Sequence, residues 1–137
     1  MKIKVTAPLF SEIIAHAREA APNECCGLIA GTEQGLAQTV YRTRNIAFNP
    51  LVTYEAAPDD LFAAQRQMRD RGEQLIAIYH SHPRSANPEP SATDVRLAYY
   101  PSAVYLIVGL GNDEPCVRAF RIDERKGWEA IEYQIVD

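Results

Sequence analysis

Residues Gln74–Asp94 read QLIAIYHSHPRSANPEPSATD and join an apolar segment to a loop rich in proline. Residues 74–80 are almost all apolar, which predicts a strand in the middle of a sheet that is covered on both faces. His80 closes this strand and His82 follows two residues later, so an extended chain points both imidazoles to the same side. Pro83 then disfavours a helix at His82 and turns the chain. The stretch therefore predicts a sheet protein with polar groups collected at the end of a central strand.

The rest of the chain alternates between strand-like and helix-like patterns. Period-two or continuous apolar patterns predict strands at residues 2–6, 24–31, 36–45, 74–80, 103–110, 116–122 and 129–136. Helical spacing of apolar residues predicts helices at 7–21 and 58–72, with a short third helix at 91–100. Residues 49–56 are expected to be extended, because Pro50 disfavours a helix before it. Together these elements predict an α/β fold, a mixed β-sheet flanked by two or three helices, in one domain spanning residues 1–137.

Composition argues against several classes of function. The 137 residues carry a net charge of −4, with 14 Lys and Arg scattered among 18 acids, so we expect no nucleic-acid partner. The longest apolar runs are strand-sized and the N-terminus lacks a long apolar block, so we expect neither a membrane span nor a signal peptide. Three cysteines, Cys25, Cys26 and Cys116, make a poor disulfide framework. We therefore expect a cytoplasmic protein with buried, apolar cysteines; a catalytic thiol beside a histidine is the alternative.

The loop after the central strand brings a carboxylate back toward the two histidines. Asp94 lies twelve residues after His82, in the first turn of the predicted third helix. Two histidines and one carboxylate leave one tetrahedral position for water, which is the pattern of a catalytic rather than a structural zinc site. Zinc in such a site lowers the pKa of its water to about 7 and polarises a carbonyl group. His80, His82 and Asp94 are thus the candidate ligands of Zn²⁺.

Each of the candidate residues also has a structural interpretation. Ser91 and Asp94 have the spacing of a helix-capping box, and the loop prolines would stiffen the chain without any chemistry. The two roles are compatible, because Ser91 can cap the helix and still offer its hydroxyl group to a substrate. Glu24 is the first residue of an otherwise apolar predicted strand. It is either a solvated strand end or the base that a zinc hydrolase needs. His16 has no ligand partner nearby and is expected on the surface or flank of its helix.

Taken together, these segments resemble a known family. ECCGLIAG at residues 24–31, HSHP at 80–83 and PSATD at 90–94 are similar to the motif of the JAMM, or MPN-plus, metalloproteases. The similarity covers nearly the whole chain, because the predicted order of elements also fits the MPN fold. The resemblance is specific, since five positions of defined type occur in the right order.

The resemblance implies a role for each matching residue. His80, His82 and Asp94 are similar to the zinc ligands of the family, with water in the fourth position. Glu24 resembles the base that takes a proton from this water and later delivers it to the leaving amine. Ser91 resembles the hydroxyl group that stabilises the oxyanion. One feature departs from the family pattern: eight residues separate His82 from Ser91, where the family usually has seven.

The same resemblance implies hydrolysis of an amide or isopeptide bond. Short stand-alone bacterial members match this chain in size and are associated with ubiquitin-like sulfur carrier proteins, whose extended tails end in Gly-Gly. They resemble enzymes that trim this tail or release cysteine from a carrier–cysteine adduct, and residues 49–56 or 83–90 would form the groove for the tail. A non-catalytic MPN scaffold is the alternative. A zinc deaminase is not favoured, because the chain lacks its H-x-E and P-C-x-x-C signatures. The sequence leaves a homodimer open.

Overall fold

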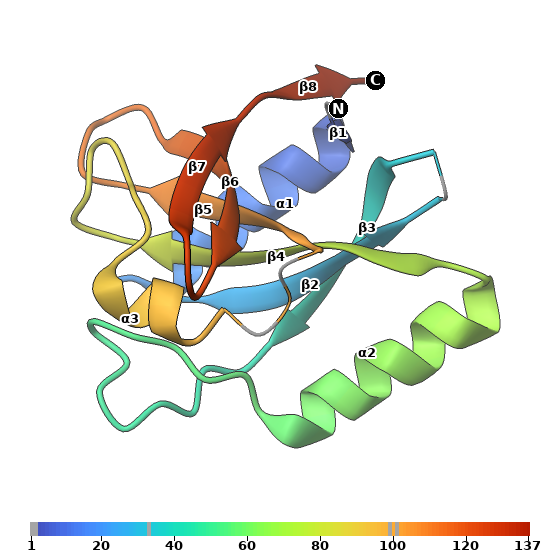
Figure 1. The fold of residues 1–137 in the computed structure, drawn as a ribbon, viewed down its shortest axis with the longest axis horizontal. Helices are drawn as coiled ribbons and strands as arrows, with labels where there is room; N and C mark the ends of the chain where they lie inside the picture. The colour runs from blue at the N-terminus through green and yellow to red at the C-terminus, as the bar shows by residue number, and fades with distance from the viewer. Residues whose placement is uncertain (1–2, 33, 99, 101) are drawn as a thin grey trace.

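The structure of the protein is a computed structural model that describes residues 3–32, 34–98, 100 and 102–137. The predicted α/β class is confirmed, with a mixed sheet and three helices within the described residues (Figure 1). The elements follow in the order β1 (Ile3–Thr6), α1 (Ala7–Ala20), β2 (Cys26–Gly31), β3 (Leu36–Thr43), α2 (Pro58–Arg71), β4 (Gln74–His82), α3 (Ala92–Arg96), β5 (Val104–Gly109), β6 (Cys116–Asp123), β7 (Gly127–Ile131) and β8 (Tyr133–Val136).

The strands form one eight-stranded sheet in the order β7-β6-β5-β4-β2-β3-β1-β8. β4 lies in the middle, antiparallel to β2 and parallel to β5. The edge strands β7 and β8 are separated in sequence by residue 132 alone, so the sheet curls until its two edges approach each other (Figure 1). β8 pairs in parallel with β1, which places the first and last strands side by side.

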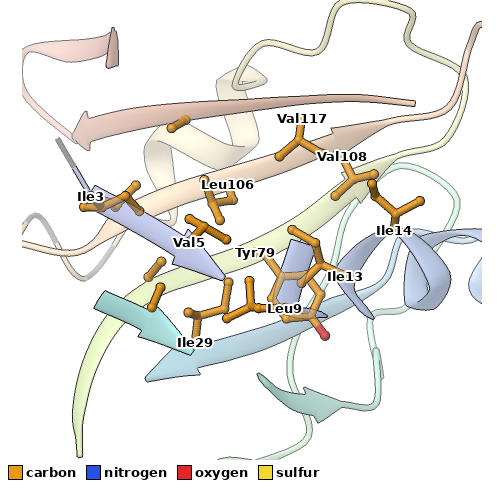
Figure 2. Packing of buried hydrophobic residues seen from close by; sticks show 14 of the residues in the cluster. Ile3, Val5, Leu9, Ile13, Ile14, Ile29, Tyr79, Leu106, Val108 and Val117 are labelled. Atoms are coloured by element: carbon orange, nitrogen blue, oxygen red, sulfur yellow. The ribbon is translucent and has the colours of Figure 1, made fainter. Parts of the chain in front are cut away.

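Helices cover both faces of the curled sheet. α1 packs on one face, where its buried side chains meet Ile29, Tyr79 and Leu106 (Figure 2). α2 packs on the other face, where Met68 joins a second cluster with Ile78. Because successive residues of a strand point to opposite faces, β4 contributes to both clusters, and its predicted central, doubly covered position is confirmed. Burying one such aliphatic side chain stabilises the fold by about 1.5–3 kcal/mol. In the described part of the chain, no helix has the length and apolar character needed to cross a membrane.

Local signals set the ends of the helices. Thr6 caps α1, since its side-chain oxygen accepts the N–H of Leu9 at 3.4 Å. Gly72 ends α2 in the left-handed conformation, at φ +69°, as the sequence predicts. α3 is shorter than the predicted helix 91–100, part of which, residue 99, lies outside the described residues. Its last turn closes with an i→i+3 bond from the N–H of Ala98 to the oxygen of Val95, which tightens and ends it.

Two other predictions are wrong in detail. Residues 49–56 are not simply extended, because Asn49 to Val52 form a turn closed by a 3.2 Å bond from the N–H of Val52 to the oxygen of Asn49. Pro50 occupies the second position of this turn, where its fixed φ angle is favourable. The predicted strand 129–136 is two strands, β7 and β8, which pair with different partners on either side of residue 132. The predicted first strand begins at residue 2, which lies outside the described residues.

Candidate metal centre

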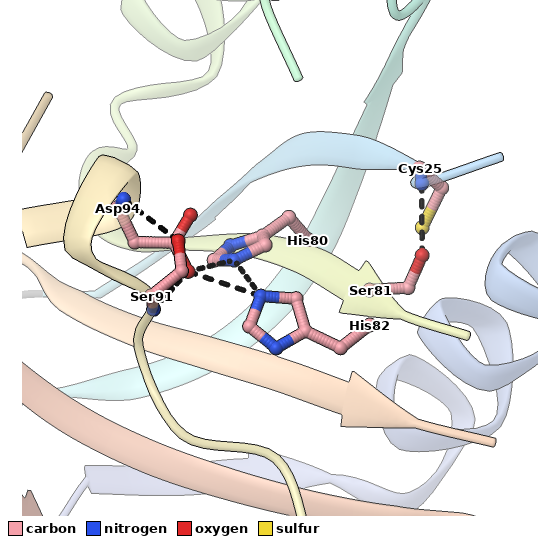
Figure 3. A network of polar contacts seen from close by, with 6 residues as sticks. All are labelled: Cys25, His80, Ser81, His82, Ser91 and Asp94. Atoms are coloured by element: carbon pink, nitrogen blue, oxygen red, sulfur yellow. Dashed lines mark hydrogen bonds and ion pairs between the residues drawn. The ribbon is translucent and has the colours of Figure 1, made fainter. Parts of the chain in front are cut away.

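The two histidines of β4 lie on the same side of the sheet, as the period of a strand predicts. His80 is completely buried, and β2 and β5 flank it. His82 is the last residue of β4 and is more open, with 15% of its side chain exposed. Ser81 points to the opposite face, where its oxygen accepts the N–H of Cys25 at 2.8 Å (Figure 3). Ser81 therefore fastens the end of β4 to the start of β2 while both imidazoles face the site.

Asp94 reaches the histidines from the first turn of α3. Its Oδ2 lies 3.1 Å from Nε2 of His80 and 3.0 Å from Nε2 of His82, and the two nitrogens are 3.2 Å apart (Figure 3). The same Oδ2 accepts the N–H of Ser91 at 2.9 Å, while the Ser91 hydroxyl oxygen accepts the N–H of Asp94 at 3.0 Å. This is the predicted capping box. It fixes the carboxylate and leaves the hydroxyl proton of Ser91 available for donation.

The spacing of these three ligand atoms fits a metal ion. Two vertices of a tetrahedral zinc site with bonds of about 2.0–2.1 Å lie about 3.3 Å apart. The three atoms of His80, His82 and Asp94 are separated by 3.0–3.2 Å. Hydrogen bonds alone do not satisfy the cluster, because each Nε2 holds at most one proton while it faces both the other nitrogen and the oxygen. Two imidazoles and one carboxylate are also a donor set that zinc accepts.

Glu24 lies beside the same histidines, just before β2. One of its carboxylate oxygens and one nitrogen of each of His80 and His82 all lie within 4.8 Å of one another. Glu24 is 5% exposed, and its Oε1 has no hydrogen-bond partner among the described residues. Burial raises the pKa of Glu24 to about 7, which His82 opposes and Asp94 reinforces. A carboxyl group with a pKa near neutrality is suited to proton transfer.

Interactions within the cluster set the charge of Asp94. Burial alone would raise the pKa of Asp94, but attraction to His80 and hydrogen bonds from His80, His82 and Ser91 outweigh it and hold the pKa well below its usual range. Burial also acts to lower the pKa of His82, but the hydrogen bond and charge of Asp94 raise it overall. Asp94 is therefore ionised at neutral pH, which a carboxylate ligand requires.

Comparison with known proteins identifies the family. The prokaryotic homologs of the JAB domain match residues 6–123, a span that contains all the predicted site residues. The chain belongs to this family. It is 36% identical over 111 residues to the desampylase of Haloferax volcanii, and the matched region covers 77% of this chain and 79% of the relative. It is 34% identical over 104 residues to the CysO-cysteine peptidase of Mycobacterium tuberculosis, and the matched region covers 76% of this chain and 70% of the relative.

The fold of this JAB-family chain is similar to that of a solved structure. The crystal structure of a JAB1/MPN domain protein from Archaeoglobus fulgidus has a TM-score of 0.64 at 20% identity and covers 98% of both chains. At that identity the likeness concerns the fold alone. The predicted MPN fold, with its mixed sheet and flanking helices, is confirmed.

The loop between the second histidine and the capping serine is held against the end of β5. Gly109 lies directly beneath it, so that an added Cβ atom would come within 2.5 Å of the carbonyl oxygen of Ser85. Pro88 is fully buried, and its carbonyl oxygen accepts a hydrogen bond from the guanidinium group of Arg118 at 3.1 Å. These contacts accommodate the eight-residue loop 83–90. Its extra residue does not separate the carboxylate from the imidazoles.

An open cleft of about 350 Å³ leads to the candidate metal centre. Residues 49–56 and 83–90, the two segments predicted to form a groove, both contribute to its walls. The cleft is lined by Glu24, Leu51, Val52, His82, Pro83, Arg84, Ser85 and Ser91. The predicted base, one predicted ligand and the predicted oxyanion donor thus face the same space.

Two residues at the site were not predicted from the sequence. The ring of Tyr54 stacks on that of His80, with centroids 4.5 Å apart and planes inclined by 27°. Nδ1 of His80 is buried without a hydrogen-bond partner among the described residues, so stacking holds this ring where a hydrogen bond usually does. Asn45 donates from Nδ2 to the carbonyl oxygen of Glu24 at 2.9 Å. Neither residue type signals a metal site, and both contacts join positions more than 20 residues apart, so the sequence offers no local signal for them.

The remaining histidine and the cysteines lie outside the cluster. His16 is half-buried on α1, and its Nδ1 bonds to the hydroxyl group of Tyr79 at 2.6 Å, which agrees with the predicted flank position. Cys25 and Cys26 are buried as predicted, whereas Cys116 is only half-buried. Burial raises the pKa of Cys25 to about 12 and that of Cys26 to about 11. Both thiols are therefore protonated at neutral pH, which disfavours the alternative of a catalytic thiol at these positions.

Proposed function

We propose that this chain is a zinc-dependent peptidase of the JAMM type. Its substrate would be an amide bond at the Gly-Gly tail of a ubiquitin-like sulfur carrier protein, or the bond between such a carrier and cysteine. The observation that carries the proposal is the convergence of three ligand atoms within 3.0–3.2 Å, with the carboxyl group of Glu24 beside them in an open cleft. The names of the relatives, a desampylase and a CysO-cysteine peptidase, support peptidase activity on a carrier-linked substrate.

His80, His82 and Asp94 are the residues that would hold the zinc ion. When bound, zinc supplies a Lewis acid and lowers the pKa of a water molecule toward about 7. The protein prepares the ligands in advance. β4 fixes both imidazoles at the end of a central strand, the ring of Tyr54 stacks on His80, and the capping box of α3 fixes the ionised carboxylate.

Glu24 and Ser91 would carry the proton transfer and the stabilisation of charge. The carboxylate of Glu24 accepts a proton from the attacking water and then donates it to the leaving amine, for which a pKa near 7 is suited. The hydroxyl group of Ser91 donates to the oxygen of the scissile carbonyl as negative charge develops there. Its oxygen already accepts the N–H of Asp94, so the hydroxyl proton is directed elsewhere. One such donor typically contributes about 10²–10³ in rate.

The size of the cleft supports a flexible tail as the substrate. A volume of about 350 Å³ is at the small end of ligand sites, so it accepts a short stretch of chain and not a folded domain. The body of a carrier protein would stay outside while its extended tail passes between the segments that contain Leu51 and Pro83. Glycine residues at the scissile end have no side chain to collide with these walls, so the backbone can approach His82 closely.

The decisive experiment uses the zinc-loaded protein and a ubiquitin-like carrier whose Gly-Gly end is extended by cysteine or a short peptide. Mass spectrometry should show release of the extension, and elemental analysis should show about one zinc per chain. Glu24→Gln should keep the zinc and lose about 10²–10⁴-fold in rate. Glu129→Gln, an exposed acid on β7, is the matched control and should cleave like the original protein. Zinc binding without any cleavage would favour a scaffold, and near-normal turnover by Glu24→Gln would overturn the assigned base.

A further inference from the structure

The segment 45–57 between β3 and α2, here called the Asn45 loop, is organised around one side chain. Asn45 donates from Nδ2 to the carbonyl oxygens of Glu24 at 2.9 Å and Thr53 at 3.1 Å. Its Oδ1 accepts the N–H groups of Ala47 and Glu55, both at 3.0 Å. An asparagine side chain has two donors and two acceptor sites, so Asn45 uses its full capacity. The loop is folded around this amide and contains only one isolated bridge of regular pairing.

The Asn45 loop holds Glu24 at both of its backbone polar groups. The carbonyl oxygen of Glu24 accepts from Asn45, and the N–H of Glu24 donates to the carbonyl oxygen of Pro50 at 2.8 Å. Glu24 lies two residues before β2, and its neighbour Cys25 is held to β4 through Ser81. The backbone hydrogen bonds of Glu24 itself go to the loop, so the loop completes the placement that Cys25 begins.

The carboxyl group of Glu24 has little else to hold it. Its Oε1 is buried and has no hydrogen-bond partner among the described residues. Where a side chain is not tied by its own hydrogen bonds, its place depends on the backbone that carries it and on packing. The same loop supplies Leu51 and Val52 to the wall of the cleft that Glu24 lines, and Tyr54 to the ring of His80.

We infer that Asn45 is a positioning residue for the reaction: by clamping the backbone of Glu24 through its loop, it sets the place of the Glu24 carboxyl group beside His80 and His82. This inference rests on the proposed function, in which Glu24 transfers the proton. The clamp requires an amide. Aspartate has no N–H to donate to the carbonyl oxygens of Glu24 and Thr53, and alanine offers neither donor nor acceptor.

Two variants of Asn45 test the inference. Asn45→Asp keeps an acceptor for Ala47 and Glu55 but loses both donated bonds, and Asn45→Ala loses all of them. Both should bind about one zinc per chain, because the candidate ligands lie on β4 and α3, and both should lose about 10²-fold in kcat, the cost of a reacting group displaced by about 1 Å. Asn112→Asp is the matched control. It adds the same charge from an exposed asparagine outside both segments of the proposed groove, whose side chain has no hydrogen bond in the described structure, and its kcat should be unchanged.

Two further measurements distinguish a change in the position of Glu24 from a general loss of folded structure. Hydrogen exchange, which needs no substrate, should quicken about tenfold at the amide of Glu24, whose acceptor is Pro50, while the amides of β4 keep their protection. In a double-mutant cycle, Asn45→Ala should cost little additional kcat in a protein that already carries Glu24→Gln, because both changes act on one group.

The outcomes distinguish this inference from the proposed function. If the original protein cleaves no carrier substrate, the proposed function fails, and hydrogen exchange at Glu24 still reports on the clamp. If the original protein is active, unchanged kcat and unchanged exchange in Asn45→Ala overturn the inference. Loss of zinc from either Asn45 variant also overturns the inference, since Asn45 would then act through the metal ligands. Fully multiplicative effects of Asn45→Ala and Glu24→Gln on kcat overturn it as well, since Asn45 would then act through substrate binding.

Discussion

Replacing Gly109 by alanine should disturb the candidate metal centre without altering any of its residues. Gly109 ends β5, and the loop 83–90 passes directly over it. A Cβ atom at this position would lie 2.5 Å from the carbonyl oxygen of Ser85 and 2.7 Å from Cδ of Pro88. One contact is with the backbone and the other with a ring joined to it, so rotation of a side chain does not relieve them.

The size of the disturbance follows from these distances. Moving the oxygen of Ser85 from 2.5 Å to an ordinary contact at 3.4 Å takes about 0.9 Å. Both contacts lie in the loop that leads directly into Ser91 and Asp94, so relieving them should displace these two residues as well. Overpacking of this kind costs about 1–3 kcal/mol of stability. A displacement of about 1 Å at reacting groups costs about 10²-fold in rate.

Gly72→Ala provides the matched control for this experiment. Gly72 ends α2 at φ +69° with nothing within 4 Å of an added Cβ atom, so alanine there costs about 1–2 kcal/mol through backbone strain alone. Both variants should show a lower midpoint of thermal unfolding. Only Gly109→Ala should also lose about 10²-fold in kcat/KM for tail cleavage and bind zinc more weakly in competition with a chelator. If the two glycine variants have equal zinc affinity and equal kcat/KM, the loop does not set the geometry of the site.

Two other predictions concern side chains around the centre. Because burial raises the pKa of Cys25 to about 12 and that of Cys26 to about 11, iodoacetamide at pH 8 should alkylate only Cys116 in the folded protein and leave peptidase activity unchanged. Mass spectrometry locates the label, and loss of activity in step with labelling of Cys25 would argue for thiol chemistry. Tyr54→Phe should bind zinc like the original protein, whereas Tyr54→Ala should bind about 2–10-fold more weakly, since an aromatic pair contributes about 0.5–1.5 kcal/mol. Equal zinc affinity in the two variants would show that stacking does not position His80.

The parts of the fold that could be predicted are those encoded by local patterns. β4 is an apolar run with two histidines at strand spacing, and this pattern suffices to place both imidazoles on one side. The capping box at Ser91 places Asp94 in the first turn of α3, again from neighbouring residues. The resemblance to the JAMM family then joined these segments to Glu24. No local pattern would have made that connection, because the residues between them form two strands and a helix.

The parts that could not be predicted depend on contacts between distant segments. A period-two pattern identifies residues 129–136 as extended but does not show that β7 pairs with β6 and β8 with β1. Gly109 reads as an ordinary strand end until the loop 83–90 is seen to lie against it. Asn45 is an unremarkable polar residue in the sequence, and its four hydrogen bonds exist only once the loop is folded.

The two halves of the candidate site are fixed by structures of different stiffness. His80 and His82 belong to a strand with a partner on each side, and changes to either neighbour would cost core packing as well. Glu24 is held by the Asn45 loop, which also contributes Leu51 and Val52 to the cleft wall. Loops tolerate substitution and insertion better than central strands do. A change in the Asn45 loop that reshapes the cleft therefore also moves the backbone partners of Glu24, while the ligands keep their places on β4 and α3. Substrate fit and the position of the base are coupled through this loop, which reaches the ligands through the ring of Tyr54 on His80.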